Sequence, residues 1–347
     1  MILKFKWLAI LELLVIIILL AVLIVEYRAS NKPDNAFEKQ TTNSENNTIK
    51  LLSPRVYAGI LEPNNLLIRN FDPLKKKLEE YMSQNNLNAS IYVVNMRSGA
   101  DFGINENDGF LPASLNKVPI AMLILKKVEK GKLSFDTMLP IDDSDRTDSF
   151  GDLYKTKEKE LPMRVLFEKM LKESDNTAFR VLQRQVDPNE IKFLVKYLDY
   201  YSADITSDYP KNLSRETLEI VTPKSMYNLF SSLYLSSVLE PNDSEYILSL
   251  LTNTVFDIKK IAGLPDDVTV SQKFGFEDVD GQQYLHSCGI MYTGNARIFY
   301  CIMTYGLSQE NGIQTIGFVV NLIHRYIADI SEELFNYRER ERATQFR

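Results

Sequence analysis

The order of strand and helix signals is the feature that most limits how this chain can fold. Amphipathic helix patterns begin and end the sequence after residue 70, at Asp72–Leu87 and Ile313–Tyr337. One strand signal comes early, and three more come late, at Ser90–Asn95, Val268–Phe276, His286–Thr293 and Ala296–Tyr305. Because segments distant in sequence must share one sheet, we expect an α/β (α+β) domain.

Helical patterns fill the interval between the early strand and the late ones. They cover residues 114–130, 162–173, 177–184, 188–200 and 223–251. These segments have no strand to pack with in their own part of the chain. We therefore expect them to form a second, all-helical lobe, with a cleft between lobe and sheet as the place for chemistry.

An apolar run near the amino end predicts a membrane anchor. Trp7–Val25 is 19 residues long and is interrupted only by Glu12, which is enough for a helix to cross a bilayer. A cleaved signal peptide is the competing interpretation; we favour the anchor, since no small-residue cleavage site follows. The predicted organisation is an anchor over residues 1–27, a flexible polar linker over 28–57 and a folded domain over 58–340.

The composition excludes several classes of function. The formal charge of −6 argues against a nucleic-acid partner. With two histidines and two cysteines, the chain cannot build a zinc ribbon or a four-cysteine cluster, and we expect no metal and no cofactor. The acidic segment Asp142–Asp148 lacks the central glycine and terminal glutamate of a calcium loop, which favours a solvated loop.

Three short motifs carry the chemistry. Ser114 and Lys117 form a Ser-x-x-Lys motif at a helix start, where the amine can reach the hydroxyl one turn away. The alternative is a serine cap followed by an exposed lysine. Ser174-Asp175-Asn176 lies between two helical segments and is itself typical of a helix cap, and Lys273-Phe274-Gly275 lies on a late strand. Each motif alone is weak, but this order and these settings form a specific pattern.

With these motifs the chain resembles the penicillin-recognising serine hydrolases, and most closely the class A β-lactamase family. The likeness runs from about Leu74 to Ile327 and includes Val221-Thr222-Pro223 and Ala262-Gly263-Leu264-Pro265. The resemblance implies a β-lactamase/transpeptidase-like fold, with a five-stranded antiparallel sheet flanked by helices plus an all-helical lobe. It also implies a location outside the cytoplasmic membrane. Together with the predicted anchor, this gives a single-pass protein of the cell membrane with its catalytic domain outside the cytoplasm.

The resemblance also implies a role for each motif residue. Ser114 becomes acylated, Lys117 takes its proton, and Ser174 relays that proton to the leaving nitrogen. Asn176 and Lys273 bind the substrate's side-chain amide and carboxylate. Gly275 belongs to the same strand motif, and the backbone N–H groups of Ser114 and Phe276 form the oxyanion hole.

Two positions depart from the family's pattern. Class A enzymes carry a deacylating glutamate in a Glu-x-x-x-Asn loop, and the nearest match here is Asp208, with Asn212 at the same spacing. The shorter acid is either a weakened base or an ordinary loop residue. Phe274 stands where the family has Thr or Ser, whose hydroxyl helps bind the substrate carboxylate. We expect penicillins to bind less well, and the ring to stack on a different acyl group.

Three functions follow from the motifs and their departures. The first is a membrane-anchored β-lactamase-like hydrolase that opens cyclic amides. The second is a D-alanyl-D-alanine carboxypeptidase or related cell-wall amidase with the same site, and the third is a non-catalytic peptidoglycan-binding relative. The expected partners are a β-lactam or a peptidoglycan stem peptide, together with the membrane through residues 7–25, and we expect a monomer.

The two cysteines give a separate expectation. If Gly294-Asn295 is a two-residue hairpin turn, Cys288 and Cys301 face each other across it. They would occupy a non-hydrogen-bonded position, where α-carbons come closest. A cross-strand disulfide and a pair of buried free thiols are both open; we favour the thiols, because that spacing is tight for a disulfide.

Overall fold

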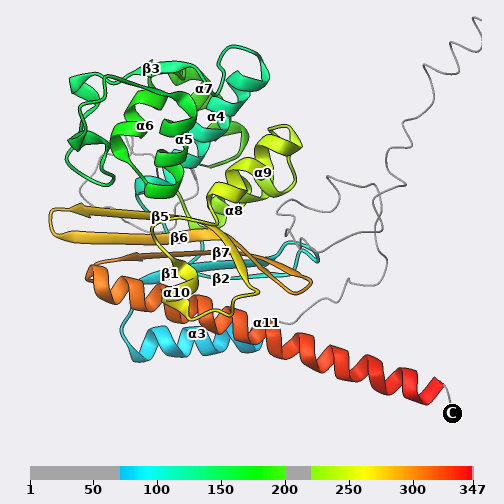
Figure 1. The fold of residues 1–347 in the computed structure, drawn as a ribbon. Coiled ribbons are helices and arrows are strands. Elements are labelled where there is room, and N and C mark those ends of the chain that lie inside the picture. The colour runs from blue at the N-terminus through cyan, green and yellow to red at the C-terminus, as the bar shows by residue number, and fades with distance from the viewer. Residues whose placement is uncertain (1–70, 201–219, 346–347) are drawn as a thin grey trace, which may run out of the picture. The chain divides into compact units, whose positions relative to one another are not determined.

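One antiparallel sheet of five strands forms the centre of the domain (Figure 1). The computed structural model describes residues 71–200 and 220–345, with side chains described up to residue 329. The strand order is β2-β1-β7-β6-β5. The strands are β1 Ala89–Asn95, β2 Asp101–Ile104, β5 Thr269–Val279, β6 Gln282–Thr293 and β7 Ala296–Tyr305.

The early strand does share a sheet with the late ones. β1 pairs along its whole length with β7, from Ala89 opposite Thr304 to Asn95 opposite Ile298. The four predicted strands are therefore confirmed. The fifth, β2, carries no separate signal in the sequence, because four residues are too few to show alternation.

Helices cover both faces of the sheet (Figure 1). One face packs against the first and last helices and a short helix before β5, in a core that includes Leu78 and Ile323. These helices are α3 Asp72–Gln84, α11 Gln309–Gln345 and α10 Ile258–Ala262. The other face packs against the predicted helical lobe in a second core, which contains Phe230 from the lobe and Phe299 from the sheet.

The helical lobe follows the predicted order with two changes. The predicted helix over 223–251 is two helices, α8 and α9, because Ser236 has a positive φ of 50° and Pro241 begins the second. The predicted helix over 162–173 ends in a π-helical turn, Lys169–Glu173. The α-helices of this lobe are α4 Lys117–Glu129, α5 Met163–Glu168, α6 Asn176–Gln183, α7 Pro188–Tyr197, α8 Pro223–Tyr234 and α9 Pro241–Leu250.

Short elements complete the lobe. The two-stranded hairpin formed by β3 Met138–Pro140 and β4 Glu160–Pro162 was not predicted. The part of the chain that the structure describes also has 3₁₀ turns at η1 Ala113–Asn116, η2 Asp143–Asp145 and η3 Leu153–Lys155. Among the described residues, no helix is both long enough and apolar enough to cross a bilayer. The predicted anchor and linker lie outside those residues.

The cysteines face each other on the two strands as the hairpin register predicts, and they are bonded. Cys288 lies opposite Cys301, with the α-carbons 3.9 Å apart, and a disulfide joins the two buried sulfurs. The preference for free thiols is therefore wrong. Both side chains leave the sheet on the same face at the closest type of cross-strand position, so the two sulfurs meet directly.

We expect the double substitution Cys288→Ala/Cys301→Ala to lower the free energy of unfolding by about 2–3 kcal/mol, because the bond closes a short loop of sequence separation 13 in the unfolded chain. Urea unfolding of the two proteins measures the difference. Mass spectrometry after alkylation of the unreduced, unfolded chain is the check: alkylation of both cysteines without reductant would contradict the bond.

Candidate active site

Ser114 lies on a tight turn that leads directly into α4. Ala113, just before it, adopts a positive φ of 47°, a strained conformation for a residue with a side chain. Lys117 begins α4, and its Nζ lies 2.9 Å from Ser114 Oγ. No side chain caps the start of η1 or of α4. The alternative of Ser114 as a helix cap is therefore wrong, and its hydroxyl faces Lys117.

Ser174 joins the second motif to the first. It ends the π-helical turn with a left-handed φ of 58° and is fully buried. Its backbone oxygen accepts a hydrogen bond of 2.6 Å from Lys117 Nζ, and its Oγ lies 3.0 Å from the same nitrogen. A non-glycine residue holds this conformation only when its surroundings fix it, and such residues gather at functional sites.

Asp175 is the helix cap of the second motif. Its carboxylate accepts hydrogen bonds from the backbone N–H groups of Ala178, at 2.8 Å, and Leu153, at 2.9 Å. The cap interpretation of Ser-Asp-Asn is thus confirmed for Asp175 only, while Ser174 and Asn176 on either side face Lys117. Asn176 Oδ1 accepts from Lys117 Nζ at 2.5 Å, and its amide nitrogen donates to Ser149 Oγ.

Lys117 is a buried amine held by oxygen atoms. Its side chain is 2% exposed. Burial lowers the pKa of Lys117 from its ordinary value to about 7, and the nearby Asp175 carboxylate opposes this with a smaller effect. At neutral pH a large share of Lys117 is therefore uncharged, with a lone pair available to the Ser114 hydroxyl.

Lys273 extends from β5 to Ser174 and is buried in the protein. Its Nζ lies 2.9 Å from Ser174 Oγ and donates to the Phe274 backbone oxygen at 3.2 Å. The side chain is fully buried, and burial, followed by the neighbouring charge of Lys117, holds the pKa of Lys273 well below its ordinary value. Lys273 therefore contacts Ser174 and does not reach the surface of the cleft.

Gly275 lets β5 come close to the Ser114 turn. A β-carbon at this position would lie 3.0 Å from Pro112 O, 3.2 Å from Ala113 Cβ and 3.4 Å from Ser114 N. β5 is an edge strand of the sheet, and its hairpin register with β6 pairs Phe276 with Leu285 in a non-hydrogen-bonded position. The backbone N–H of Phe276 therefore points away from β6, toward the free edge beside Ser114.

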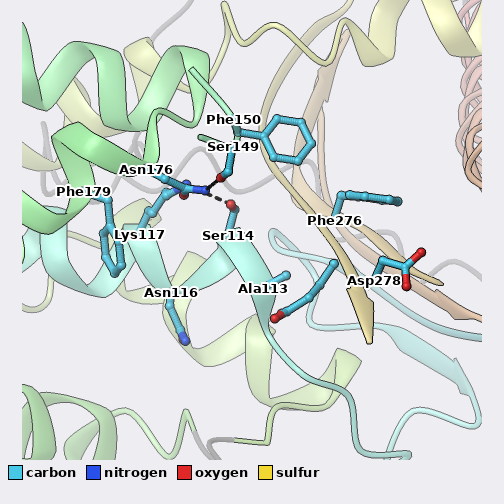
Figure 2. Close-up of a pocket in the computed structure, with 11 residues that line it drawn as sticks. Ala113, Ser114, Asn116, Lys117, Ser149, Phe150, Asn176, Phe179, Phe276 and Asp278 are labelled. Atoms are coloured by element: carbon cyan, nitrogen blue, oxygen red, sulfur yellow. Dashed lines mark hydrogen bonds between the residues drawn. The ribbon is translucent and has the colours of Figure 1, made fainter. Parts of the chain in front are cut away.

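A cavity of about 660 Å³ opens in front of Ser114 (Figure 2). Of the predicted site residues, Ser114, Lys117, Asn176 and Phe276 line it, whereas Ser174, Lys273 and Phe274 are buried behind its surface. The remaining lining residues were not predicted as site residues: Ala113, Asn116, Ser149, Phe150, Phe179, Glu277 and Asp278. Position beside a motif, as with Glu277 and Asp278 after Phe276, is the signal that could have found some of them.

Several acidic groups of the helical lobe have structural partners. Asp142 and Asp145 form a capping box, and both pair with Arg184, at 2.6 and 2.7 Å. Asp145 is buried, so the expectation of a simply solvated loop is wrong there. One carboxylate oxygen from each of Asp152, Glu173 and Asp175 lies within 4.8 Å of the other two. Lys169 already forms ion pairs with Asp152 and Glu173. Asp208 lies outside the described residues.

Comparisons with known proteins agree with this geometry. A family model described as the Beta-lactamase enzyme family matches residues 73–327. The β-lactamase VEB-1 of Pseudomonas aeruginosa is 20% identical over 278 residues, which cover 77% of this chain and 90% of that protein.

Solved structures share the fold. The extended-spectrum β-lactamase TLA-3 superposes with a TM-score of 0.66 and 20% identity, covering 74% of this chain and 99% of the other. PBP-A superposes with a TM-score of 0.64 and 20% identity, covering 75% and 98%. A PBP-A variant solved as an acyl-enzyme complex with penicillin G has a TM-score of 0.65 and 21% identity, covering 76% and 98%.

The fold is therefore the β-lactamase/transpeptidase-like fold that the motifs predicted. The family match spans both lobes and includes the Ser-x-x-Lys, Ser-Asp-Asn and Lys-x-Gly motifs. The chain belongs to the β-lactamase enzyme family.

Proposed function

We propose that this chain is a membrane-anchored serine hydrolase that opens β-lactams outside the cytoplasm through an acyl-enzyme on Ser114. One observation carries the proposal above the others. Lys117 Nζ lies 2.9 Å from Ser114 Oγ and 3.0 Å from Ser174 Oγ, in a site where burial lowers its pKa to about 7. This is the arrangement that a nucleophile, its base and a proton relay require.

Acylation requires proton transfers among Ser114, Lys117 and Ser174. Neutral Lys117 takes the proton of the Ser114 hydroxyl, and Oγ forms an ester bond to the lactam carbonyl carbon. The carbon–nitrogen bond of the lactam then breaks. Lys117 gives up its proton through Ser174 Oγ, which delivers one to the leaving nitrogen. Lys273, 2.9 Å from Ser174 Oγ, orients that hydroxyl.

The negative oxygen that develops during attack needs donors on the opposite side of the carbonyl. The Ser114 and Phe276 backbone N–H groups are our candidates, because Gly275 brings β5 against the Ser114 turn. Preorganised donors of this kind are worth about 3–4 kcal/mol of barrier each. Asn176, on the cavity wall, is our candidate for binding the substrate's side-chain amide.

Labelling with a fluorescent penicillin tests this function. We expect the full-length chain, purified in detergent, to become labelled on Ser114, with peptide mapping identifying the site. The Ser114→Ala variant is the matched control and takes no label. A folded wild-type protein that remains unlabelled at millimolar penicillin would contradict the proposal.

We assign deacylation to Asp208, the nearest match in the sequence to the family's deacylating glutamate. If Asp208 activates the water, Asp208→Glu should change the rate at which label leaves Ser114 and leave the labelling rate nearly unchanged. The longer side chain moves the carboxylate by about one bond length, and general-base catalysis is sensitive to shifts of this size. Pulse labelling followed by a chase with unlabelled β-lactam measures both rates. Equal chase rates for the two proteins would count against this role.

A cell-wall peptidase is the second candidate. A PBP-A variant, which shares the fold, has been solved as a penicillin G acyl-enzyme. A stable acyl-enzyme is what a peptidase gives with a β-lactam. Persistent label without turnover, together with release of D-alanine from a stem peptide, would favour it. No label and no peptide cleavage would leave the non-catalytic peptidoglycan binder.

The proposed location rests on the apolar run at residues 7–25 and on the substrates of the family, which are found outside the cytoplasmic membrane. Protease treatment of intact cells, with the cell wall removed, tests it. We expect the domain to be cleaved from the cell surface, whereas a cytoplasmic marker protein survives.

A further inference from the structure

The strand that carries the Lys-x-Gly motif presents an aromatic surface to the cleft in place of a cation. Lys273 is fully buried, and its Nζ lies 4.2 Å from the centroid of the Phe274 ring, besides its contacts with Ser174 Oγ and the Phe274 carbonyl. Lys273 does not line the cavity. A carboxylate in the cavity cannot contact this amine unless Phe274 moves.

The Phe274 ring is held in place from both sides of the cleft. It stacks on Phe256, with centroids 5.3 Å apart and an interplanar angle of 22°, and meets the Phe150 ring edge-on at 5.9 Å. Phe150 comes from the helical lobe, where its backbone oxygen accepts from Asn176 N at 3.0 Å. Phe274 is 4% exposed. Displacing it would break ring contacts on both sides of the cleft.

Phe150 and Phe276 continue this surface into the cavity. Their centroids lie 6.0 Å apart in an edge-on arrangement, and Figure 2 shows both rings on the same side of Ser114. Phe276 comes from β5 and Phe150 from the opposite lobe, so the two rings bridge the cleft beside the nucleophile. A ligand group on this side of Ser114 would contact these rings.

The charges on the cavity wall also disfavour an anionic ligand group beside Ser114. Among the described residues that line it, the ionisable side chains are Lys117, Glu277 and Asp278. Lys117 is already surrounded by oxygen atoms of Ser114, Ser174 and Asn176, so the remaining charges are two carboxylates. An anionic substituent would be repelled by these carboxylates and would find no free cation on the described wall.

We propose that this site selects acyl donors whose group beside the scissile amide carries no negative charge, and that Phe274 sets this selectivity by covering Lys273. The inference rests on the proposed acylation of Ser114 and names its substrate class. Phe274 acts on the ligand by excluding a carboxylate from Lys273 and by supporting the Phe150 and Phe276 rings.

A matched pair of β-lactams tests the inference. Benzylpenicillin carries the carboxylate, and its methyl ester carries none. Intact-protein mass spectrometry on the full-length chain gives the second-order rate constant for acylation of Ser114 by each. We expect the ester to react at least as fast as the acid; a faster reaction with the acid overturns the inference and leaves the proposed function standing.

A substitution of Phe274 tests whether this residue sets the selectivity. We expect Phe274→Thr to uncover Lys273 and to raise the acid-to-ester ratio of rate constants by about tenfold or more, the effect of one hydrogen bond to a charged group. Phe193→Thr, at an exposed ring on α7 that is 73% exposed, is the matched control and leaves the ratio unchanged. A folded Phe274→Thr protein with the wild-type ratio would assign the selectivity elsewhere and overturn the proposal.

The outcomes distinguish failure of the proposed function from failure of the inference about Phe274. If neither probe acylates Ser114, the proposed function fails and the inference fails with it. If both acylate and the acid is preferred, only the inference fails. The ratio measured on the unchanged chain decides between these results even if Phe274→Thr does not fold.

Discussion

Replacement of Lys117 by Gln is expected to slow acylation of Ser114 by about a thousandfold, the usual size of a lost general base. Glutamine is long enough to keep hydrogen bonds to Ser174 and Asn176, but its amide cannot take the Ser114 proton. The second-order rate constant for penicillin labelling, measured near pH 8, gives the effect. The circular dichroism spectrum and melting temperature show whether the variant folds.

The pH dependence identifies Lys117 more sharply than the loss of rate. The uncharged amine is the base, and the pKa of Lys117 is lowered to about 7. Wild-type acylation is therefore expected to fall about tenfold for each pH unit below 7 and to level off above it. Lys117→Gln should lose this dependence. A profile that stays flat from pH 5 to 8 in the wild-type protein would contradict Lys117 as the base.

Replacement of Asp175 by Ala is expected to lower the free energy of unfolding by about 3–5 kcal/mol. The buried carboxylate accepts two hydrogen bonds, from Ala178 N and Leu153 N, and bonds to a charged group contribute about 1.5–3 kcal/mol each. Loss of the acceptor also leaves two buried N–H groups without a partner. Urea unfolding, monitored by circular dichroism, measures the difference.

Asp175→Asn separates the structural role of the carboxylate from its electrostatic one. The amide oxygen still accepts one hydrogen bond, so we expect a smaller loss of stability than with Ala. The carboxylate raises the pKa of Lys117 against the effect of burial, so its neutralisation should shift the midpoint of the acylation profile below pH 7. An unchanged midpoint in a folded Asp175→Asn protein would show that the carboxylate acts on stability alone.

Much of the fold could be predicted because long elements carry strong periodic signals. β5, β6, β7 and the helices around them have enough residues to show which face is buried. Local exceptions caused the errors. The sequence predicts a helix from Ser114, but α4 begins at Lys117. Pro119 was the available signal, since proline lacks a backbone N–H and fits the first turn of a helix.

The site residues that belong to sequence motifs could be predicted. Those that come together only through the tertiary fold could not. Ser114, Lys117, Ser174 and Lys273 could be named from the sequence, and the structure brings their side chains together. The enclosure of Lys273 could not, because it depends on how the Phe274 ring is held by Phe150 and Phe256, which come from segments without a motif. Contacts between distant loops leave no periodic pattern in the chain.

The pairing of β1 with β7 has a consequence for how the protein folds. The strands are separated by about 200 residues of sequence, so the sheet cannot close until nearly the whole chain has been made, and contacts of such long range fold slowly. The helices of the lobe have local partners and can form earlier. Lys273 arrives with the late strands, so Ser114 and Lys117 exist for a time without it. A shortened chain that ends before β7 should therefore keep helical structure but lack a closed sheet and a working nucleophile.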